Sequence, residues 1–221
     1  MKIPPPEQSE SWYHNARERM VHEQIELRGI RDREVLRAMR EVSRHRFVPE
    51  AIREEAYEDT PLYIGFHQTI SQPYIVAYMI EQLKLLTSDR VLEIGLGSGY
   101  QAAVLSRLVS EVYAIEVIPE LERSASLILT ELGYTNVQTR CGNGWEGWQE
   151  HAPYDAIIAA AAADKLPAKL VEQLAEGGRM IIPIGDDRMT QSLHYFEKQA
   201  GSVVEKKGIG VMFVPLIHPS W

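Results

Sequence analysis

The chain has 221 residues, 45% of them hydrophobic and 24% charged, which is the composition of an ordinary globular protein with room for one α/β core. Its net charge of −8 argues against a protein that grips nucleic acid through a broad basic surface. No apolar segment is long enough to cross a bilayer, and the polar, proline-rich start does not resemble a signal peptide. The single cysteine, Cys141, forbids an internal disulfide and is interpreted as a small buried residue at a strand end. We therefore expect a cytoplasmic protein that binds neither membranes nor nucleic acid.

The first part of the chain predicts a helical extension after a loosely tethered lead at residues 1–10. Residues 12–28 carry an apolar stripe that ends before Gly29, and Asp32 is a good N-cap for a second helix. The segment around Arg44 and His45 interrupts the helical pattern. We interpret its histidine and arginines as surface residues, because no other ligand type lies at metal-binding spacing.

The stretch from Tyr63 to Tyr74 has no clean period of 2 or 3.6 and is rich in hydroxyls and amides. It immediately precedes a helix predicted over residues 73–85, and Pro73 suits the first turn of that helix. Ser71 therefore has two interpretations, a helix cap or a member of a functional site. The residues alone favour the cap, because serine before proline is common at helix starts.

A glycine-rich turn follows the next apolar run. Residues 90–94 predict a buried parallel strand, and Gly95, Gly97 and Gly99 then alternate before a helix at residues 101–109. Glycine permits positive φ and lets a ligand lie against main-chain N–H groups. The third glycine comes one residue too early for the G-x-G-x-x-G fingerprint, which disfavours NAD and FAD.

Two acidic residues accompany this turn. Glu93 precedes the first glycine by two positions, and Glu116 ends the next apolar run, near the roughly 20-residue offset at which a carboxylate binds ribose hydroxyls. The segment E-x-G-x-G-x-G resembles class I methyltransferases that use S-adenosylmethionine. An ordinary strand-to-helix turn is the alternative, but the second carboxylate at this offset favours cofactor binding.

Strands and helices alternate through the rest of the chain. The pattern predicts strands at residues 112–116, 137–140, 155–160 and 179–183, and helices at residues 119–132 and 167–174. Residues 191–197 and 211–216 predict two further strands, separated by a polar loop with Lys206 and Lys207. We expect an α/β fold with a doubly wound, mostly parallel Rossmann-like sheet, an antiparallel C-terminal edge and an N-terminal helical extension. Ligands bind such sheets at the carboxyl ends of the strands.

Several segments together resemble the protein-L-isoaspartate O-methyltransferase family. The most specific is Gln68-Thr-Ile-Ser-Gln-Pro73, and Phe47-Val-Pro, Ala152-Pro-Tyr-Asp155 and Phe213-Val-Pro-Leu216 also match. The resemblance implies that Ser71 is the active-site residue and that S-adenosyl-L-methionine is the cofactor, with no metal. The residues it implies for cofactor binding are Thr69, Glu93, Gly95, Gly97, Gly99, Glu116, Val117, Asn143 and Gly144.

The resemblance also implies the reaction and the organisation of the chain. A methyl group would pass to the free carboxylate of L-isoaspartyl, and by extension D-aspartyl, residues in damaged proteins, leaving S-adenosyl-L-homocysteine; the ester then closes to a succinimide and permits repair. We expect residues 1–72 to form the extension with a substrate-side loop and residues 73–221 the methyltransferase domain; the chain length predicts one compact domain overall, which we expect to be a monomer. His67 and Asn143 depart from the family's usual glycine and aspartate, which leaves substrate preference and cofactor affinity open.

Two other functions remain as alternatives. One is a methyltransferase that acts on a small molecule or RNA, against which stand the acidic charge and the lack of a base-methylation motif after the fourth strand, at Ala159. The other is a non-catalytic adaptor that has kept the fold, which the intact glycines and Glu116 disfavour. Ser71 is not a convincing nucleophile, because no G-x-S-x-G elbow surrounds it.

Overall fold

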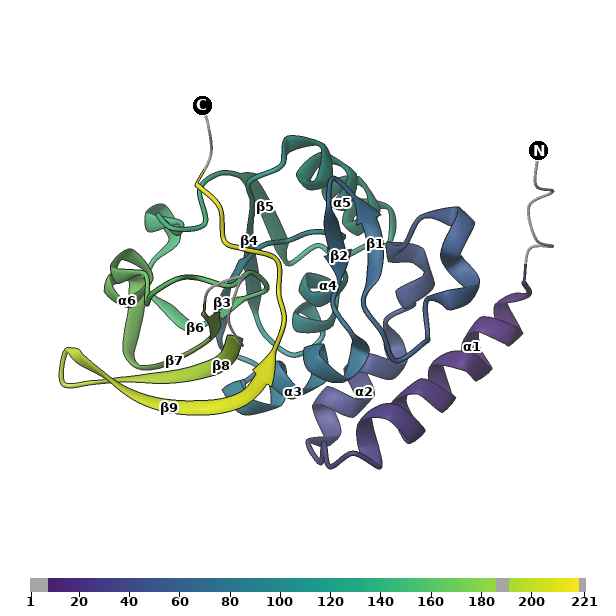
Figure 1. Ribbon diagram of the computed structural model, residues 1–221, viewed down its shortest axis with the longest axis horizontal. Coiled ribbons are helices and arrows are strands. Elements are labelled where there is room, and N and C mark those ends of the chain that lie inside the picture. Colours follow the sequence, from purple (N-terminus) through teal and green to yellow (C-terminus); the bar gives the residue numbers. More distant parts are fainter. Residues whose placement is uncertain (1–7, 186–190, 219–221) are drawn as a thin grey trace.

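The computed structural model describes residues 8–185 and 191–218, which form a seven-stranded sheet with helices packed on it (Figure 1). The strand order is β5-β4-β3-β6-β7-β8-β9. These strands are β3 (Arg90–Ile94), β4 (Glu111–Glu116), β5 (Val137–Cys141), β6 (Tyr154–Ala159), β7 (Leu174–Ile184), β8 (Gln191–Gln199) and β9 (Ser202–Val211). Part of the lead expected at residues 1–10 lies outside the described residues.

The first half of the sheet is parallel and doubly wound, as predicted. β3 pairs in parallel with both β4 and β6, and β4 pairs in parallel with β5. The chain thus runs outward from β3 to β5 and returns to β6, so the carboxyl ends of β3 and β6 flank the topological switch point. The connecting helices are α4 (Tyr100–Ser106), α5 (Pro119–Glu131) and, after β6, α6 (Ala168–Gln173). Because β5 is an edge strand, Cys141 at its end is exposed, and the prediction of a buried cysteine was wrong.

The antiparallel edge is also present, but its last strand is not where the sequence placed it. β7 pairs antiparallel with β8, and β8 with β9, and the two lysines of the supposed loop lie within β9. An edge strand has solvent on both sides, so its polar residues do not show the alternation of a half-buried strand. The expected strand at residues 211–216 instead leaves the sheet after Val211, and its backbone pairs locally with Ala162. Pro215 has no N–H with which to continue a ladder.

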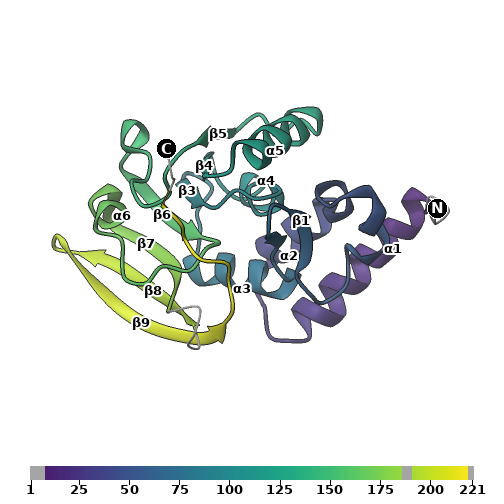
Figure 2. The same cartoon turned by 45° about the horizontal axis from the view of Figure 1, so that its top comes forward.

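Alternate residues of the sheet face two separate apolar layers. Val91 and Val112 pack in the larger layer, with the N-terminal helices, α3 (Pro73–Leu83), α4 and α5. Leu92 and Tyr113 pack in the smaller layer, with α6 and Trp148. Figures 1 and 2 both show the N-terminal helices and β9 at opposite ends of the molecule, with the parallel strands between them.

The N-terminal extension is helical, as predicted, and shares the larger layer. It contains α1 (Glu10–Arg19), a π-helical continuation η1 (Met20–Glu26), α2 (Arg33–Glu41) and two 3₁₀ turns, η2 (Arg44–Phe47) and η3 (Glu50–Glu55). Asp32 caps α2, because its Oδ1 accepts hydrogen bonds from the backbone N–H groups of Glu34 and Val35, at 2.9 and 3.2 Å. Met20 and Met39 are buried in the same apolar cluster as Val91 and Val112, so the extension and the sheet share one core.

The prediction that Arg44 and His45 are surface residues was wrong. Arg44 is completely buried, and its Nε donates a 2.7 Å hydrogen bond to the carbonyl oxygen of Ala56. His45 is 2% exposed; its ring stacks on Tyr13 at 3.9 Å and its Nδ1 hydrogen-bonds the Tyr57 hydroxyl at 2.8 Å. Charged residues are seldom buried unless they find such partners, and these partners come from other segments of the extension.

The irregular stretch before α3 is a β-hairpin, β1 (Leu62–Gly65) and β2 (Gln68–Ile70). Phe66 and His67 form its turn with φ of 53° and 58°. Two-residue hairpin turns of type I′ need positive φ at both central positions and usually use Asn-Gly or Asp-Gly. The aromatic pair gives no such sequence signal, which is why the hairpin was not predicted.

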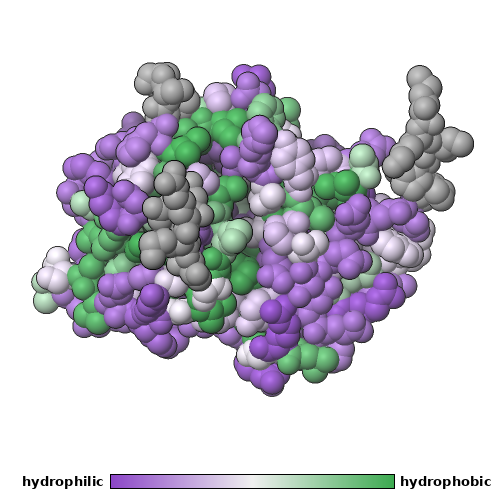
Figure 3. Space-filling model, viewed as in Figure 1, coloured by the Kyte–Doolittle hydropathy of each residue, from purple (hydrophilic) through white to green (hydrophobic). Residues whose placement is uncertain are grey.

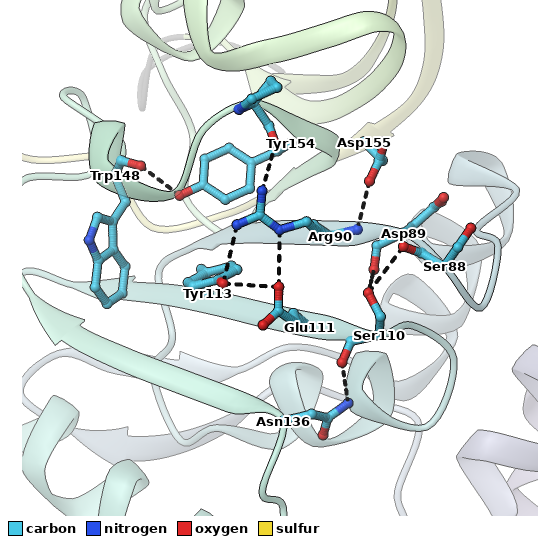
Figure 4. A network of polar contacts seen from close by, with 11 residues as sticks. Ser88, Asp89, Arg90, Ser110, Glu111, Tyr113, Asn136, Trp148, Tyr154 and Asp155 are labelled. Carbon is cyan, nitrogen blue, oxygen red and sulfur yellow. Dashed lines mark hydrogen bonds and ion pairs between the residues drawn. The ribbon is translucent and has the colours of Figure 1, made fainter.

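The starting end of the parallel strands carries a closed polar network (Figure 4). Arg90 donates from Nε to Glu111 at 3.0 Å and from Nη2 to the Tyr113 hydroxyl at 3.2 Å. The backbone N–H of Arg90 donates to the Asp155 carboxylate at 2.8 Å. These bonds join the starts of β3, β4 and β6, so this end of the sheet is fixed and the carboxyl ends remain for a ligand.

Candidate active site

A cleft opens at the carboxyl ends of β3, β4 and β6, between the hairpin and the segment that follows β9. Its space is about 770 Å³ when the part open to solvent is included. The predicted site residues that line it are Thr69, Ser71, Glu93, Gly95, Gly97, Glu116, Val117 and Gly144. Gly99 and Asn143 are not among its lining residues.

The glycine turn has the predicted backbone, with φ of 86°, 54° and 87° at Gly95, Gly97 and Gly99. The N–H groups of these three glycines, however, are already hydrogen-bonded within the protein. Gly95 N–H donates to a β4 carbonyl, that of Ile115, at 2.9 Å, and Gly99 N–H donates to Leu96 at 2.9 Å. A Cβ at Gly99 would lie 3.3 Å from side chains of α5, so this glycine permits packing of the helix. The turn therefore offers close approach to a ligand rather than free donors at these three positions.

Glu93 is completely buried at the end of β3 and lines the cleft. Its Oε1 accepts a 2.9 Å hydrogen bond from Gln101, whereas its Oε2 is buried with no hydrogen-bond partner in the described part of the chain. Burial raises the pKa of this carboxyl to about 8; the Gln101 amide opposes the shift and the charge of Glu116 adds to it. An unpartnered buried acceptor beside a cleft is a natural site for a ligand donor.

Glu116, at the end of β4, holds the glycine turn. Its Oε2 accepts from the Gly97 N–H at 2.8 Å and its Oε1 accepts from the Ile118 N–H at 3.0 Å. Burial raises the pKa of this carboxyl, and the hydrogen bonds from the backbone lower it. Because a carboxylate has four acceptor positions, both oxygens can still accept from vicinal hydroxyls.

Asn143 and Gly144 follow β5, and they have different roles. The Asn143 Oδ1 accepts a 3.0 Å hydrogen bond from the Trp145 N–H, which closes a local turn. Gly144 lines the cleft, and a Cβ there would lie 2.6 Å from Ile94 and 3.0 Å from Leu216. Only glycine fits at this position without displacing its neighbours.

Ser71 does not cap α3. The N-cap is Gln72, which makes no side-chain capping bond, and the Ser71 hydroxyl makes no hydrogen bond to any described residue. Ser71 and Thr69 line this inner cleft and also a second, outer groove that runs along Gly210 to Val214. Both hydroxyls therefore stand where the two cavities meet.

Some lining residues could not be identified from the sequence. Gln101 holds Glu93, and Val214 to Ile217 close one side of the cleft. Two backbone hydrogen bonds to Ala162 hold this C-terminal segment. The Ala162 N–H donates to the Val214 carbonyl at 2.8 Å, and the Leu216 N–H donates to the Ala162 carbonyl at 2.7 Å. Only Phe213-Val-Pro-Leu216 carried a signal, through the family resemblance. His67 lies in the hairpin turn and outside the lining of the cleft.

Two further classes of site are absent from the described residues, namely metal centres and membrane spans. No group of three or more histidine, cysteine, aspartate or glutamate side chains there could hold a metal ion. No helix there is long and apolar enough to span a membrane.

The comparisons with known proteins agree with one another. A family model described as protein-L-isoaspartate(D-aspartate) O-methyltransferase matches residues 15–220. A curated protein-L-isoaspartate O-methyltransferase from Gloeobacter violaceus is 50% identical over 197 residues, which cover 89% of this chain and 96% of the relative.

Two solved structures are similar over almost all of this chain. One is a protein-L-isoaspartate O-methyltransferase with a TM-score of 0.81 and 32% identity; the match covers 90% of this chain and 65% of that one. The other is a putative protein-L-isoaspartate O-methyltransferase from Plasmodium falciparum in complex with S-adenosyl-L-homocysteine. Its TM-score is 0.80 at 28% identity, and the match covers 91% of this chain and 98% of that one.

Proposed function

The chain belongs to the protein-L-isoaspartate(D-aspartate) O-methyltransferase family, and from this premise we propose that Ser71 orients the isoaspartyl carboxylate of a damaged protein for methylation. The enzyme is an S-adenosylmethionine-dependent protein carboxyl methyltransferase that acts in protein repair. The position of the Ser71 side chain supports this role. Its hydroxyl, free of other hydrogen bonds among the described residues, lines both the inner cleft and the outer groove.

The inner cleft fits the cofactor. S-adenosylmethionine supplies, when bound, a methyl group activated by a positively charged sulfonium. The unpartnered Glu93 Oε2 suits a cationic or N–H donor, and the Glu116 carboxylate suits ribose hydroxyls. Gly95, Gly97 and Gly144 admit the ligand close to the backbone, while Thr69 and Val117 complete the walls.

The outer groove fits a polypeptide. One side of it is lined by the glycine and the apolar residues from Gly210 to Val214. It shares Thr69 and Ser71 with the inner cleft. A carboxylate that enters here is already ionised at neutral pH, so no general base is required. What the protein must supply is orientation, and a hydroxyl that donates one hydrogen bond to the carboxylate supplies it.

We place the enzyme in the cytoplasm as a monomer that acts on proteins and not on nucleic acid. The net charge of −8 supports a substrate other than nucleic acid. The lone Cys141, which has no cysteine partner in the chain, suits a reducing compartment.

The test is methyl transfer to a peptide that contains isoaspartate, with the same peptide containing aspartate as the matched control. The parent enzyme should methylate only the isoaspartyl peptide. Ser71→Ala should lower the rate by about 10- to 1,000-fold, the order expected when a reacting group loses its orientation. Its melting temperature and cofactor affinity should stay unchanged, because the hydroxyl makes no structural bond among the described residues.

Two further variants complete this test. Ser202→Ala, at an exposed position at the start of β9, is the control and should behave like the parent. A double variant that also replaces Thr69 with valine should be slower than Ser71→Ala if Thr69 supplies a substitute hydroxyl. A normal rate in Ser71→Ala, on the same preparation that binds cofactor normally, would exclude the orienting role.

A further inference from the structure

A third cavity, which no step of the proposed reaction uses, lies beside the glycine turn, between α5 and the N-terminal extension. We call it the α5 pocket. Its space is about 930 Å³ when the part open to solvent is included. It shares Gly97 and Ser98 with the inner cleft, and none of the described residues lines both it and the outer groove. The α5 pocket is therefore a neighbour of the inner cleft and separate from the groove that leads to Ser71.

The walls of the α5 pocket are mainly apolar. Leu121, Ala125 and Ile128 form one wall, and their spacing places them on one face of α5. The opposite wall is the segment Phe47-Val-Pro49, which matches the family but lines neither the inner cleft nor the outer groove. Figure 3 shows small apolar patches set among polar residues on the side of the molecule that carries the hairpin and the extension. A concave apolar surface with a few polar groups is typical of a site for a small molecule.

Four charged side chains also line the α5 pocket, and one of them has an unused donor. The Arg46 Nη2 donates to the Glu131 carboxylate at 2.7 Å, so these two charges are paired. Glu50 is exposed to solvent. The Arg53 Nε is buried and has no hydrogen-bond partner in the described part of the chain. Because buried donors are seldom left without an acceptor, the Arg53 guanidinium is a natural position for the anionic group of a ligand.

Positive charge is concentrated in this part of the extension. Burial, together with the charges of Arg17, Arg46 and Arg53, lowers the pKa of the neighbouring His45 to about 4. The three arginines thus produce a positive potential strong enough to disfavour a further cation beside them. The same potential favours an anion in the α5 pocket.

The α5 pocket also reaches the backbone of the glycine turn. Ile64 of β1 lines the pocket, and its Cδ1 lies 3.5 Å from the position that a Cβ would take at Gly97. The Gly97 N–H donates to Glu116 at 2.8 Å. A molecule that packs against Ile64 and Ser98 therefore restrains a turn that also lines the inner cleft.

We propose that the α5 pocket binds an organic anion with an apolar body, and that its occupant strengthens the binding of S-adenosylmethionine in the inner cleft. The apolar body lies between α5 and the Phe47-Val-Pro49 segment, and the anionic group accepts from Arg53. An occupied pocket holds the glycine turn in place, so less conformational entropy is lost when the cofactor binds. The coupling rests on the proposed place of the cofactor, whereas the binding of the anion does not.

The first experiment titrates the enzyme with anilinonaphthalene sulfonate, an apolar anion whose fluorescence rises in apolar surroundings. The enzyme is saturated with S-adenosylhomocysteine beforehand, so that the inner cleft is filled. Arg53→Gln removes the positive charge, and Ser124→Trp fills the pocket from an exposed position of α5. The matched controls are Arg123→Gln and Leu127→Trp, at exposed positions of the same helix outside the pocket lining.

Arg53→Gln should weaken binding of the probe by about tenfold, the order expected for a lost charge-assisted hydrogen bond. Ser124→Trp should abolish saturable binding, and the two controls should bind like the parent. All four variants should keep the melting temperature of the parent and its methylation rate without the probe, because the substituted residues line neither the inner cleft nor the outer groove. Equal affinity for the probe in the parent, Arg53→Gln and Ser124→Trp would overturn the site.

The second experiment measures S-adenosylmethionine affinity by calorimetry with and without the probe. The probe should tighten cofactor binding to the parent by about fivefold and leave Ser124→Trp unchanged. Equal affinity with and without the probe would overturn the coupling. So would weaker binding in the parent and in Ser124→Trp alike, because the probe would then compete in the inner cleft. A parent that binds the probe but no S-adenosylmethionine would contradict the proposed function and still support the anion site.

Discussion

Glu93 and Arg44 are both completely buried charged side chains, and both keep polar atoms without a hydrogen-bond partner among the described residues. Their surroundings differ. The free Oε2 of Glu93 belongs to a side chain that lines the inner cleft, where we propose that the cofactor binds. Arg44 lines none of the cavities described above; its guanidinium lies over the Tyr100 ring, 4.8 Å from the centroid, and its Nε bonds the Ala56 carbonyl.

One physical cause acts on both groups in opposite directions. Burial disfavours the charged form, so it raises the pKa of Glu93 to about 8 and lowers the pKa of Arg44 to about 10. The free-energy cost of burying the Glu93 charge can be offset when a donor of the bound cofactor reaches Oε2. The cost of burying the Arg44 charge is offset only by contacts within the protein. A buried charge beside a cleft therefore indicates binding, and one enclosed by packed residues indicates a structural clamp.

The largest effect on stability is expected at the clamp. Arg44→Ala removes the bond to Ala56, the contact with Tyr100 and most of the side-chain volume, so the free energy of unfolding should fall by about 3–4 kcal/mol. Arg44→Met fills the space without a charge and should lose much less. Urea denaturation of both variants measures the difference. Equal stability of Arg44→Ala and the parent would show that the residue is no clamp.

A smaller change in the free energy of unfolding, opposite in sign, is expected at Glu93. Because the pKa of Glu93 is above its ordinary value, the cost to stability is absent below pH about 4.5, grows as pH rises toward 8 and is constant above. Glu93→Gln should therefore raise the free energy of unfolding by roughly 2 kcal/mol at pH 8.5 without cofactor, and by nothing at pH 4. Denaturation at the two pH values checks this. An equal gain in the free energy of unfolding at both pH values would exclude ionisation of Glu93 as the cause of the gain.

The smallest effect is expected at Asn143, next to the inner cleft. Asn143 bonds the Trp145 N–H beside Gly144, so it shapes the cleft without being among its lining residues. Asn143→Ala removes this bond and loosens the loop that carries Gly144, so S-adenosylmethionine binding should weaken by up to about 1 kcal/mol, because the cofactor must then order the loop that the bond now holds. Asn143→Asp keeps the acceptor and should restore the affinity. Calorimetry on both variants would also reveal the opposite case, in which neither differs from the parent.

The strand ends and the glycine turn at the inner cleft were predictable because the sequence patterns that indicate them are local. The strand before Gly95 and the offset of Glu116 are each set by a short run of sequence. Asp32 was likewise identified as a cap from the residues that follow it, and its capping bonds confirm this. Such features require no knowledge of distant segments.

The features that the sequence did not predict depend on distant partners. Arg44 is buried because Ala56 and Tyr100 accommodate it, and the segment after β9 follows Ala162 rather than β8. The hairpin was missed for a different reason, since Phe66 and His67 adopt positive φ without glycine or asparagine. For Ser71 the residues alone favoured a cap, and only the family resemblance pointed to the active site.

The most direct test of the contrast between Glu93 and Arg44 is the S-adenosylmethionine affinity of Glu93→Gln and Arg44→Met, measured by calorimetry at pH 8.5. Loss of a charge-assisted hydrogen bond should weaken binding to Glu93→Gln by about tenfold or more. Arg44→Met should bind within about threefold of the parent, because its side chain does not line the cleft. Parent-like affinity in Glu93→Gln, together with a tenfold loss in Arg44→Met, would contradict the assignment of binding to the one and structure to the other.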